Sequence, residues 1–270
     1  MINNDNFIIW LEGYMDALES KGVEKIETSI IRNKLKTINL QHFARKLYSQ
    51  NSEDGITIKL IEMLYDNPEN KNYVEFGVED GMQCNTKVLR KNYGWNGLMM
   101  DGTYYNSFIN LQSEFVTREN VCSLFEKYNI PKNINLLCVD IDMNDYWVLK
   151  EIIKEYTADI IITEYNGHLA ATESKTVPYK PENMWDGTNY YGASLLAFNK
   201  LLEPAGYTLV CCDPNGVNAF FVKTTLLKER NINIKNAGNV GELFTPMNQS
   251  GSGRAKEHPA DKKNRKYINV

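Results

Sequence analysis

Residues 74–86 read VEFGVEDGMQCNT: an apolar run with a carboxylate, then two glycines four residues apart, then polar residues. Glu75, Gly77 and Gly81 form the pattern E-x-G-x-x-x-G. A short apolar run that leads through glycines into a helical pattern indicates a buried strand, a tight loop and a helix. In open α/β sheets ligands bind beyond the carboxyl ends of such strands, so we expect this loop to line a ligand site.

The charge of the loop separates the ligands that use such a strand end. Dinucleotide folds carry G-x-G-x-x-G, whose backbone amides approach a pyrophosphate. Here Glu79 takes the place of the second glycine and Asp80 follows it. Two carboxylates facing two phosphates in a low-dielectric crevice would repel them by on the order of a few kcal/mol. S-adenosylmethionine carries a sulfonium and an ammonium group and no phosphate, so an acidic loop favours it as the cofactor, and the Walker pattern is absent from the sequence.

The rest of the chain predicts a parallel sheet covered by helices on both faces. Apolar strand candidates alternate with helical patterns, at residues 72–78, 96–102, 134–142, 158–166, 206–212 and 218–223, with a weaker one near Phe115 and Val116. The last two strands are joined by the short turn DPNG, which predicts an antiparallel hairpin. We therefore expect an α/β fold with a Rossmann-like, doubly wound, mostly parallel sheet that ends in an antiparallel hairpin, a layout typical of class I methyltransferases.

The chain is expected to have three parts. Residues 1–45 form a helical extension, because FIIWLEGYMDAL and VEKIETSIIRNKLKTI both show helical spacing of apolar residues. These helices resemble short modules of phage-encoded proteins and serve either as a cap or as a contact between copies in a homo-oligomer. Residues 46–225 form the methyltransferase-like domain, and 226–270 a polar tail that is solvated, or acts as a lid or as a wrapped terminal strand at YINV.

Composition restricts the class of protein. With 270 residues, 43% apolar and 11% aromatic, the chain can bury one substantial core. The formal net charge of −4 gives no general attraction to nucleic acid or to anionic membranes. Five cysteines without CxxC spacing, and no apolar run near the length of a membrane span, predict a reduced, cytoplasmic setting, either bacterial or the host cytoplasm of a phage. We interpret the cysteines as packing residues.

Further cofactor contacts are expected after the second and fourth strands. Asp101 ends the second strand in GLMMDG, where one carboxylate can accept both ribose hydroxyls, of NAD as well as of S-adenosylmethionine. A helix cap or turn is the alternative role of Asp101. Gly102, Asn120 and Asp140 complete the predicted cofactor-binding set with Glu75, Gly77, Gly81 and Asp101.

Acidic residues follow two neighbouring strands. Asp140 and Asp142 come two apart at the end of one strand, and their side chains share a face if the chain stays extended. The next strand brings Glu164, Asn166 and His168 to the same rim. Asp140, Asp142, Glu164 and Asn166 offer the hard oxygen ligands of a Mg²⁺ site. Asp142, Glu164 and His168 are the predicted catalytic residues, while helix capping by Asp142 or Asn144 and a bystander role of His168 remain the alternatives.

Two more segments are expected near the pocket. SQNSEDG precedes the first strand, and Gln50 and Asp54 either face the pocket or belong to a helix start capped by Ser52. In MWDGTNYYGAS, Trp185, Tyr190 and Tyr191 either stack against a sugar ring or pack in the core.

The motifs taken together resemble a known family over residues 46–223. They are YSQNSEDGI, YVEFGVEDGMQCNT, YGWNGLMMDG, LLCVDIDMNDYWVLK, IIITEYN, YYGASLLAFNKLLEPAGYTLVCC and GVNAFFVK, in the order of the FkbM-type branch of S-adenosylmethionine-dependent methyltransferases. The first-strand motif of that family is more often D-V-G-A-N-x-G, so Glu75 replaces an aspartate. Its later D-V-E-G-x-E motif is similar to Asp140, Asp142 and Asp145, with Met143 in place of the usual glycine.

The resemblance implies methyl transfer to oxygen on sugars, polyketides or similar small molecules. We therefore predict an S-adenosylmethionine-dependent O-methyltransferase, with or without Mg²⁺, that acts on a hydroxyl of a small molecule or glycan and has neither nucleic-acid nor membrane partners. One alternative is a metal-dependent nucleotide-sugar glycosyltransferase, for which Asp140 to Asp142 form the D-x-D signature. The other is a non-catalytic methyltransferase-like binding module.

Overall fold

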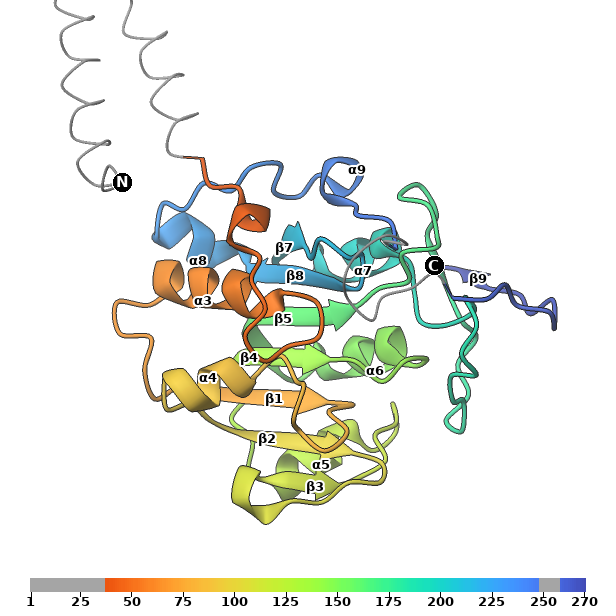
Figure 1. The fold of residues 1–270 in the computed structure, drawn as a ribbon, viewed down its shortest axis with the longest axis horizontal. Coiled ribbons are helices and arrows are strands. Elements are labelled where there is room, and N and C mark those ends of the chain that lie inside the picture. The colour runs from red at the N-terminus through yellow and green to blue at the C-terminus, as the bar shows by residue number, and fades with distance from the viewer. Residues whose placement is uncertain (1–36, 248–257) are drawn as a thin grey trace, which may run out of the picture.

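The structure, a computed structural model, describes residues 37–247 and 258–270. Its centre is a seven-stranded sheet with the order β3-β2-β1-β4-β5-β8-β7 (Figure 1). The strands are β1 (Asn72–Phe76), β2 (Asn96–Asp101), β3 (Leu111–Ser113), β4 (Asn133–Val139), β5 (Thr157–Glu164), β7 (Tyr207–Cys212) and β8 (Asn218–Lys223), with β6 (Lys175–Thr176) and β9 (Ile268–Asn269) in a separate pair.

The direction of the strands confirms the predicted fold class. Strands β1 to β5 pair in parallel, whereas β8 is antiparallel to both β5 and β7. Gly216 closes the hairpin with a positive φ of 76°, and its amide donates to the carbonyl of Asp213. One predicted strand is misplaced: the third strand is Leu111–Ser113, and Val116 instead lies buried in the core after the strand has ended.

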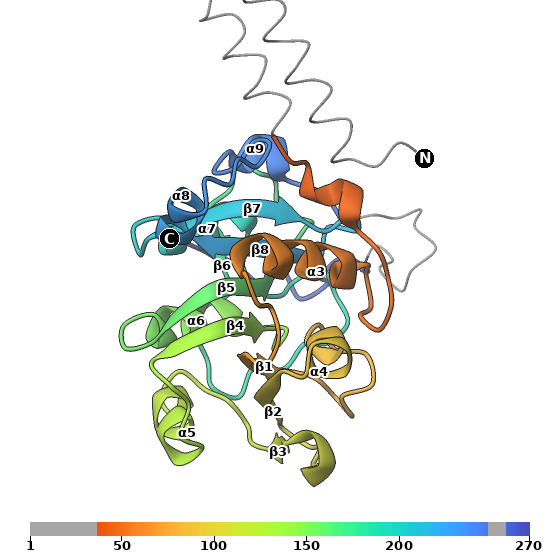
Figure 2. The ribbon, with the colours of Figure 1, turned by 90° about the vertical axis from the view of Figure 1, so that its left-hand side faces the viewer.

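Helices cover both faces of the sheet, as the continuous apolar runs of the strands require. They are η1 (Leu40–Phe43), α3 (Glu53–Leu64), α4 (Lys87–Asn92), η2 (Ser107–Ile109), α5 (Val121–Lys127), α6 (Asp145–Ile152), α7 (Leu195–Leu202), α8 (Thr224–Glu229) and α9 (Val240–Leu243). One core cluster joins the sheet to α5, α6 and α7, and the other joins it to η1, α3, α4 and α8 (Figure 2). The sheet thus lies between two helical layers.

The domain begins earlier than residue 46. Leu40 is only 1% exposed and packs in the core. Ile38 bridges to Ile234, and the Gln41 amide donates to the carbonyl of Cys212. The expected boundary after residue 45 therefore does not coincide with a break in packing. The helix predicted at 7–18, and nearly all of the one predicted at 23–38, lie outside the described residues.

The last residues of the chain return to the body of the protein. Strand β9 pairs antiparallel with β6, and the Val270 amide donates to the carbonyl of Ser174. The Arg265 guanidinium lies 2.9 Å from the Asp186 carboxylate and over the ring of Tyr190. Residues 258–270 are thus held against the loop that follows β6. No helix in the described ranges is long and apolar enough to span a membrane.

Candidate active site

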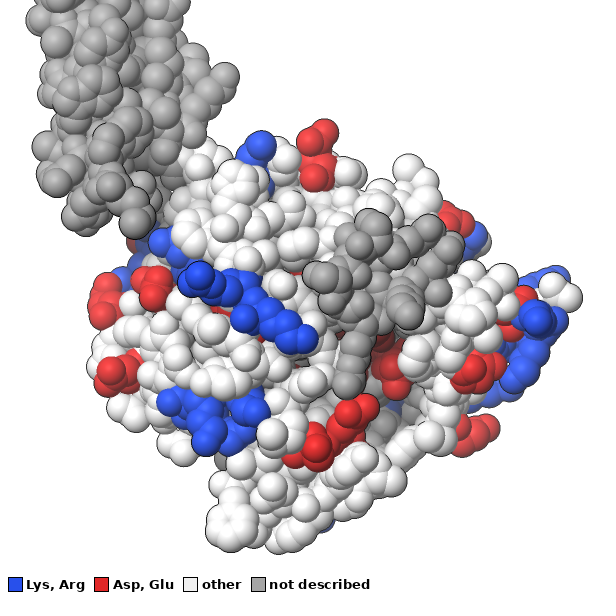
Figure 3. All heavy atoms as spheres, in the orientation of Figure 1, with Lys and Arg blue, Asp and Glu red and all other residues white. Residues whose placement is uncertain are grey.

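A cavity of about 360 Å³ opens at the carboxyl ends of the strands. The loops that follow β1 and β4 and the last residues of β2 and β5 line it, together with residues at the start of α3, the loop before α7, the turn between β7 and β8, and His258. Its acidic lining residues are Glu53, Glu75, Glu79, Asp101, Asp140, Asp142 and Glu164, and no Lys or Arg is among the described residues that line it. Figure 3 shows Asp and Glu atoms gathered over the strand ends, with Lys and Arg atoms elsewhere on that face.

The two glycines of the first loop are required by its shape. Gly77 has a φ of +66°, and a Cβ added to it would lie 1.7 Å from the carbonyl oxygen of Asp140. Gly81 has a φ of +75°, and its added Cβ would lie 2.6 Å from Cδ1 of Ile109. Residues with a Cβ disfavour this left-handed conformation and would clash here. The glycines therefore let the chain turn sharply and bring the loop against the end of β4.

Glu75 joins β1 to the helix that follows the loop. Its side chain is only 3% exposed, and its carboxylate accepts hydrogen bonds from the amides of Asn85 (2.7 Å) and Thr86 (2.9 Å) and from the Thr86 hydroxyl. Burial raises the pKa of Glu75, and the hydrogen bonds from Thr86 and Asn85 oppose this. Glu75 lines the cavity. Its carboxylate is nevertheless mainly occupied in holding the loop closed.

Asp101 lies at the cavity with only part of its carboxylate available. Oδ1 accepts from the Thr103 amide and hydroxyl, both at 2.9 Å, and from the Tyr104 amide at 3.3 Å. Oδ2 accepts one hydrogen bond, from the Glu79 amide at 3.0 Å. A carboxylate oxygen has two lone pairs. Asp101 can therefore accept a ligand hydroxyl through Oδ2, whereas the expected two-oxygen contact with both ribose hydroxyls would break the loop's own bonds.

The structure does not bring two of the predicted cofactor contacts into the cavity lining. Asn120 precedes α5, where its side chain accepts from the Thr117 amide and donates to the carbonyl of Phe115. Gly102 is exposed next to Asp101, and its added Cβ would meet only the ring of Phe115. Both residues lie in the turns on either side of β3. Their position in the sequence placed them at the cofactor, but neither lines the cavity.

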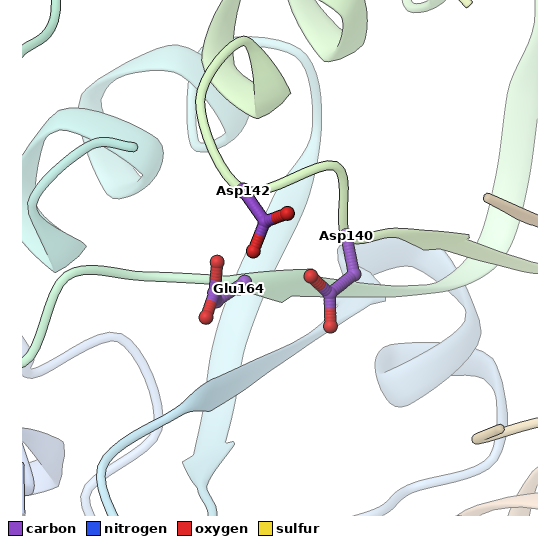
Figure 4. Close-up of side chains that lie close together, drawn as sticks. All are labelled: Asp140, Asp142 and Glu164. Carbon is purple, nitrogen blue, oxygen red and sulfur yellow. The ribbon is translucent and has the colours of Figure 1, made fainter. Parts of the chain in front are cut away.

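Three carboxylates converge at the ends of β4 and β5, and we call Asp140, Asp142 and Glu164 the acidic cluster (Figure 4). One oxygen of each lies within 4.8 Å of one oxygen of each of the others. Val139 pairs with Thr163 in the sheet, so Asp140 and Glu164 leave neighbouring strands at the same level. Asp142 has a positive φ of 64°. A turn, not the expected extended chain, thus directs Asp142 back toward Asp140.

The surroundings make the acidic cluster hold protons more tightly than ordinary carboxylates. Burial, followed by the nearby charges of Asp142 and Asp145, raises the pKa of Asp140 well above its usual range. Burial and then Asp140 do the same for the pKa of Glu164. Burial and then Glu79 raise the pKa of Asp142. Oε2 of Glu164 is buried without a hydrogen-bond partner among the described residues. An electropositive ligand would relieve both the repulsion and the missing bond.

Two predicted neighbours of the acidic cluster have structural roles. Asn166 is fully buried, and its amide donates to the carbonyls of Asn189 and Tyr191 and to the hydroxyl of Tyr267. Its side-chain oxygen accepts from the amide of His168 at 3.0 Å, and Asn166 does not line the cavity, so the structure does not bring it to the acidic cluster as the predicted ligand set required. Asp145 accepts from the amide of Ile141 at 2.7 Å and so closes the turn before α6.

Histidine reaches the cavity from another part of the chain than predicted. His168 follows β5, but it does not line the cavity; its ring centroid lies 6.3 Å from that of Tyr191 and 5.3 Å from that of His258. His258 lines the cavity, with its ring centroid 4.7 Å from that of Trp185. Burial and the neighbouring His168 lower the pKa of His258. Nothing in the local sequence of the tail indicated this position, because it depends on the pairing of β9 with β6.

The segment before α3 is only partly as predicted. Gln50 lines the cavity with Asn51 and Glu53. Asp54 is fully buried and instead accepts from the amides of Leu47, Tyr48 and Ser49 through one oxygen.

The aromatic loop before α7 divides in the same way. Trp185 and Tyr191 line the cavity, and Tyr190 does not. Tyr190 and Tyr191 are both buried in one cluster with Met143 and Val177, so Tyr191 belongs to the core as well as to the lining.

Comparisons with known proteins add similarities of fold. No protein-family model and no curated protein matches the chain. The N-terminal domain of EvdMO1, crystallised in the presence of SAH and D-fucose, has a TM-score of 0.41 and 14% identity, covering 63% of this chain and 82% of that domain. An O-methyltransferase family protein from Burkholderia thailandensis has a TM-score of 0.35 and 3% identity, and the match covers 64% of this chain and 57% of that one. A SAM-dependent methyltransferase from Aquifex aeolicus has a TM-score of 0.30 and 12% identity, and the match covers 61% of this chain and 86% of that one. The order and directions of the strands of this chain are those of a Rossmann-like, mostly parallel sheet that ends in an antiparallel hairpin.

Proposed function

We propose that this protein is an S-adenosylmethionine-dependent O-methyltransferase that acts on a hydroxyl of a small molecule or glycan. One observation carries the proposal: the glycine loop after β1, Asp101 at the end of β2 and the acidic cluster at the ends of β4 and β5 all open onto one cavity. Methyl transfer is an in-line displacement, which requires cofactor and acceptor side by side and a group that handles the acceptor's proton. A single cavity with both sets of residues meets that requirement.

The residues of the cavity fit S-adenosylmethionine by charge and by size. A volume of about 360 Å³ lies within the usual range of ligand pockets. The lining is acidic, which suits a cofactor whose sulfonium and ammonium groups outweigh its single carboxylate, and it opposes a pyrophosphate. Gly77 and Glu79 would lie along the cofactor, and the free lone pair of Asp101 Oδ2 would accept a ribose hydroxyl.

The acidic cluster fits a divalent cation as well. Its donors are hard carboxylate oxygens, the kind that Mg²⁺ prefers, and Oε2 of Glu164 has no other partner among the described residues. Asp140, Asp142 and Glu164 would hold the ion. When bound, Mg²⁺ supplies Lewis acidity that lowers the pKa of an acceptor hydroxyl. Without it, a carboxylate of the acidic cluster would take the proton of that hydroxyl.

Isothermal titration calorimetry with S-adenosylhomocysteine tests the cofactor assignment. We expect binding to the full-length protein, and a loss of about 1.5–3 kcal/mol in Asp101→Ala, the scale of a hydrogen bond to a charged group. Phe108→Ala is a matched control, since this side chain is 98% exposed and does not line the cavity. Absence of binding at millimolar ligand would refute the cofactor, and unchanged affinity in Asp101→Ala would remove this residue from the site.

The glycosyltransferase alternative is less well supported. Asp140 and Asp142 do converge, as a D-x-D motif requires. However, a nucleotide sugar also brings a diphosphate, and the described lining of the cavity offers carboxylates and no Lys or Arg to neutralise it. Titration of UDP-glucose with Mg²⁺ in the same calorimetric experiment distinguishes the two functions. Binding of UDP-glucose and not of S-adenosylhomocysteine would reverse the assignment.

A further inference from the structure

Three aromatic rings form one side of the cavity, and we call Trp185, Tyr191 and His258 the aromatic wall. The ring centroids of Trp185 and His258 are 4.7 Å apart, those of Tyr191 and His258 5.4 Å, and those of Trp185 and Tyr191 6.1 Å. The same cavity contains the acidic cluster. A ligand bound against the aromatic wall therefore has access to the three carboxylates.

The C-terminal segment is fastened in a way that holds His258 in place. The Asn189 amide donates to the carbonyl of Pro259 at 2.9 Å, and the Asp261 amide donates to the Asn189 side chain at 2.9 Å. Lys263 and Arg265 both lie 2.9 Å from the carboxylate of Asp186, in the loop that carries Trp185. The two segments that supply the aromatic wall are thus tied to each other by residues that directly follow His258 and Trp185.

The aromatic wall carries polar atoms that lack partners. Nδ1 of His258 and the hydroxyl of Tyr191 are buried, and neither has a hydrogen-bond partner among the described residues. Such atoms cost free energy unless a ligand satisfies them. A hydroxyl group both donates and accepts, so it matches His258 in either neutral tautomer. The unpaired atoms therefore indicate a ligand with several hydroxyls.

The charge of the cavity restricts the ligand further. The acidic cluster lies within the same cavity, and no described lining residue is Lys or Arg. A phosphate or carboxylate on the acceptor would be repelled by these carboxylates and would find no cation. The flat rings of Trp185 and His258 suit an apolar ring face. An uncharged ring with hydroxyls at its edge meets all three conditions.

We propose that His258, supplied by the C-terminal segment, is an acceptor-binding residue, and that the acceptor is an uncharged, polyhydroxylated ring. The ring lies against Trp185, and one of its hydroxyls bonds to Nδ1 of His258. A second hydroxyl is then directed to the acidic cluster. This inference deepens the proposed methyl transfer and rests on it for the methylation of that second hydroxyl. Binding of the ring depends on the aromatic wall and does not require methyl transfer.

Saturation-transfer difference NMR on the full-length protein with S-adenosylhomocysteine measures this binding without turnover. The probes are methyl glucopyranoside, methyl galactopyranoside and methyl mannopyranoside, with glucose 6-phosphate and glucuronate as anionic counterparts. We expect saturation of ring protons in at least one neutral glycoside and in neither anion. His258→Phe keeps an aromatic ring and removes Nδ1, and it should raise Kd about 2- to 10-fold, the range of one hydrogen bond. Trp185→Ala should raise it to a similar extent.

Matched controls separate binding from folding. His42→Phe makes the same substitution at an exposed histidine that does not line the cavity, and it should leave Kd unchanged. Thermal melts identify a variant that has lost its fold. If either His258→Phe or Trp185→Ala fails to fold, the other still tests the aromatic wall. No saturation of any neutral glycoside, equal binding of the anions, or an unchanged Kd in both His258→Phe and Trp185→Ala would overturn the inference.

A parallel assay of methyl transfer from radiolabelled S-adenosylmethionine distinguishes this inference from the proposed function. Glycoside binding that is lost in His258→Phe, without any methyl transfer, would support the aromatic wall and refute the enzyme. Methyl transfer to an anionic acceptor, without glycoside binding, would support the enzyme and refute the uncharged acceptor.

Discussion

Gly77→Ala is the substitution for which the structure predicts the largest backbone conflict in the site. The residue has a φ of +66°, and the new Cβ would lie 1.7 Å from the carbonyl oxygen of Asp140. The left-handed conformation costs about 1–2 kcal/mol for a residue with a Cβ. Forcing the end of β4 aside adds about 1–3 kcal/mol, the usual cost of overpacking. We therefore expect a total loss of about 2–5 kcal/mol in the free energy of unfolding.

Gly206→Ala separates the cost of the left-handed conformation from the cost of overpacking. Gly206 has a φ of +91°, and its added Cβ would meet nothing within 4 Å, so only the conformational cost of about 1–2 kcal/mol applies. Urea unfolding in EDTA, followed by tryptophan fluorescence, measures both variants against the parent protein. An equal loss of stability in the two variants would refute the close approach of the loop to β4.

The displaced end of β4 also carries Asp140, a member of the acidic cluster. Gly77→Ala should therefore weaken the stabilisation by Mg²⁺ that we expect for the parent protein, whereas Gly206→Ala should not. Retention of the full Mg²⁺ effect in Gly77→Ala would show that the ion, if bound, does not depend on this part of the chain.

Three further predictions concern the acids and the chain ends. Asp142→Ala should lower turnover by at least about a hundredfold with little change in cofactor affinity, and His168→Ala should lower turnover less. A larger loss of turnover in His168→Ala than in Asp142→Ala, measured by steady-state kinetics, would make histidine the base. Burial raises the pKa of Asp145 to about 7, and the pKa values of the acidic cluster are raised too. The native state then binds more protons than the unfolded chain, so in EDTA stability should fall as pH rises from about 4 to 7, and melting temperatures that rise over this range would contradict it. Deleting residues 1–46, which removes the buried Leu40, should cost about 2–5 kcal/mol more than deleting residues 1–36; equal melting temperatures of the two truncated proteins would show that residues 37–46 do not belong to the domain.

The predicted fold came from patterns that are local in the chain. Continuous apolar runs, helical spacing between them and the DPNG turn each reflect burial or turn geometry over a few residues. The strands of the main sheet lie where these patterns placed them, apart from β3, and β6 was not predicted; these two strands have three and two residues, too few to show a pattern. Gly77 and Gly81 were identified for the same reason, since a left-handed turn favours glycine within the segment itself.

The composition of the site was decided by tertiary contacts. The acidic cluster forms because parallel strands β4 and β5 end at one edge, which follows from the predicted sheet, but the direction of Asp142 depends on its turn. Asn166 and Asp54 have side chains suited to a ligand, yet backbone groups elsewhere in the fold occupy them. His258 reaches the cavity through the docking of the C-terminal segment on the loop after β6. Polar residue types thus revealed which side chains are able to bind a ligand, whereas competition among hydrogen-bond partners across the folded chain determined which of them are available to do so.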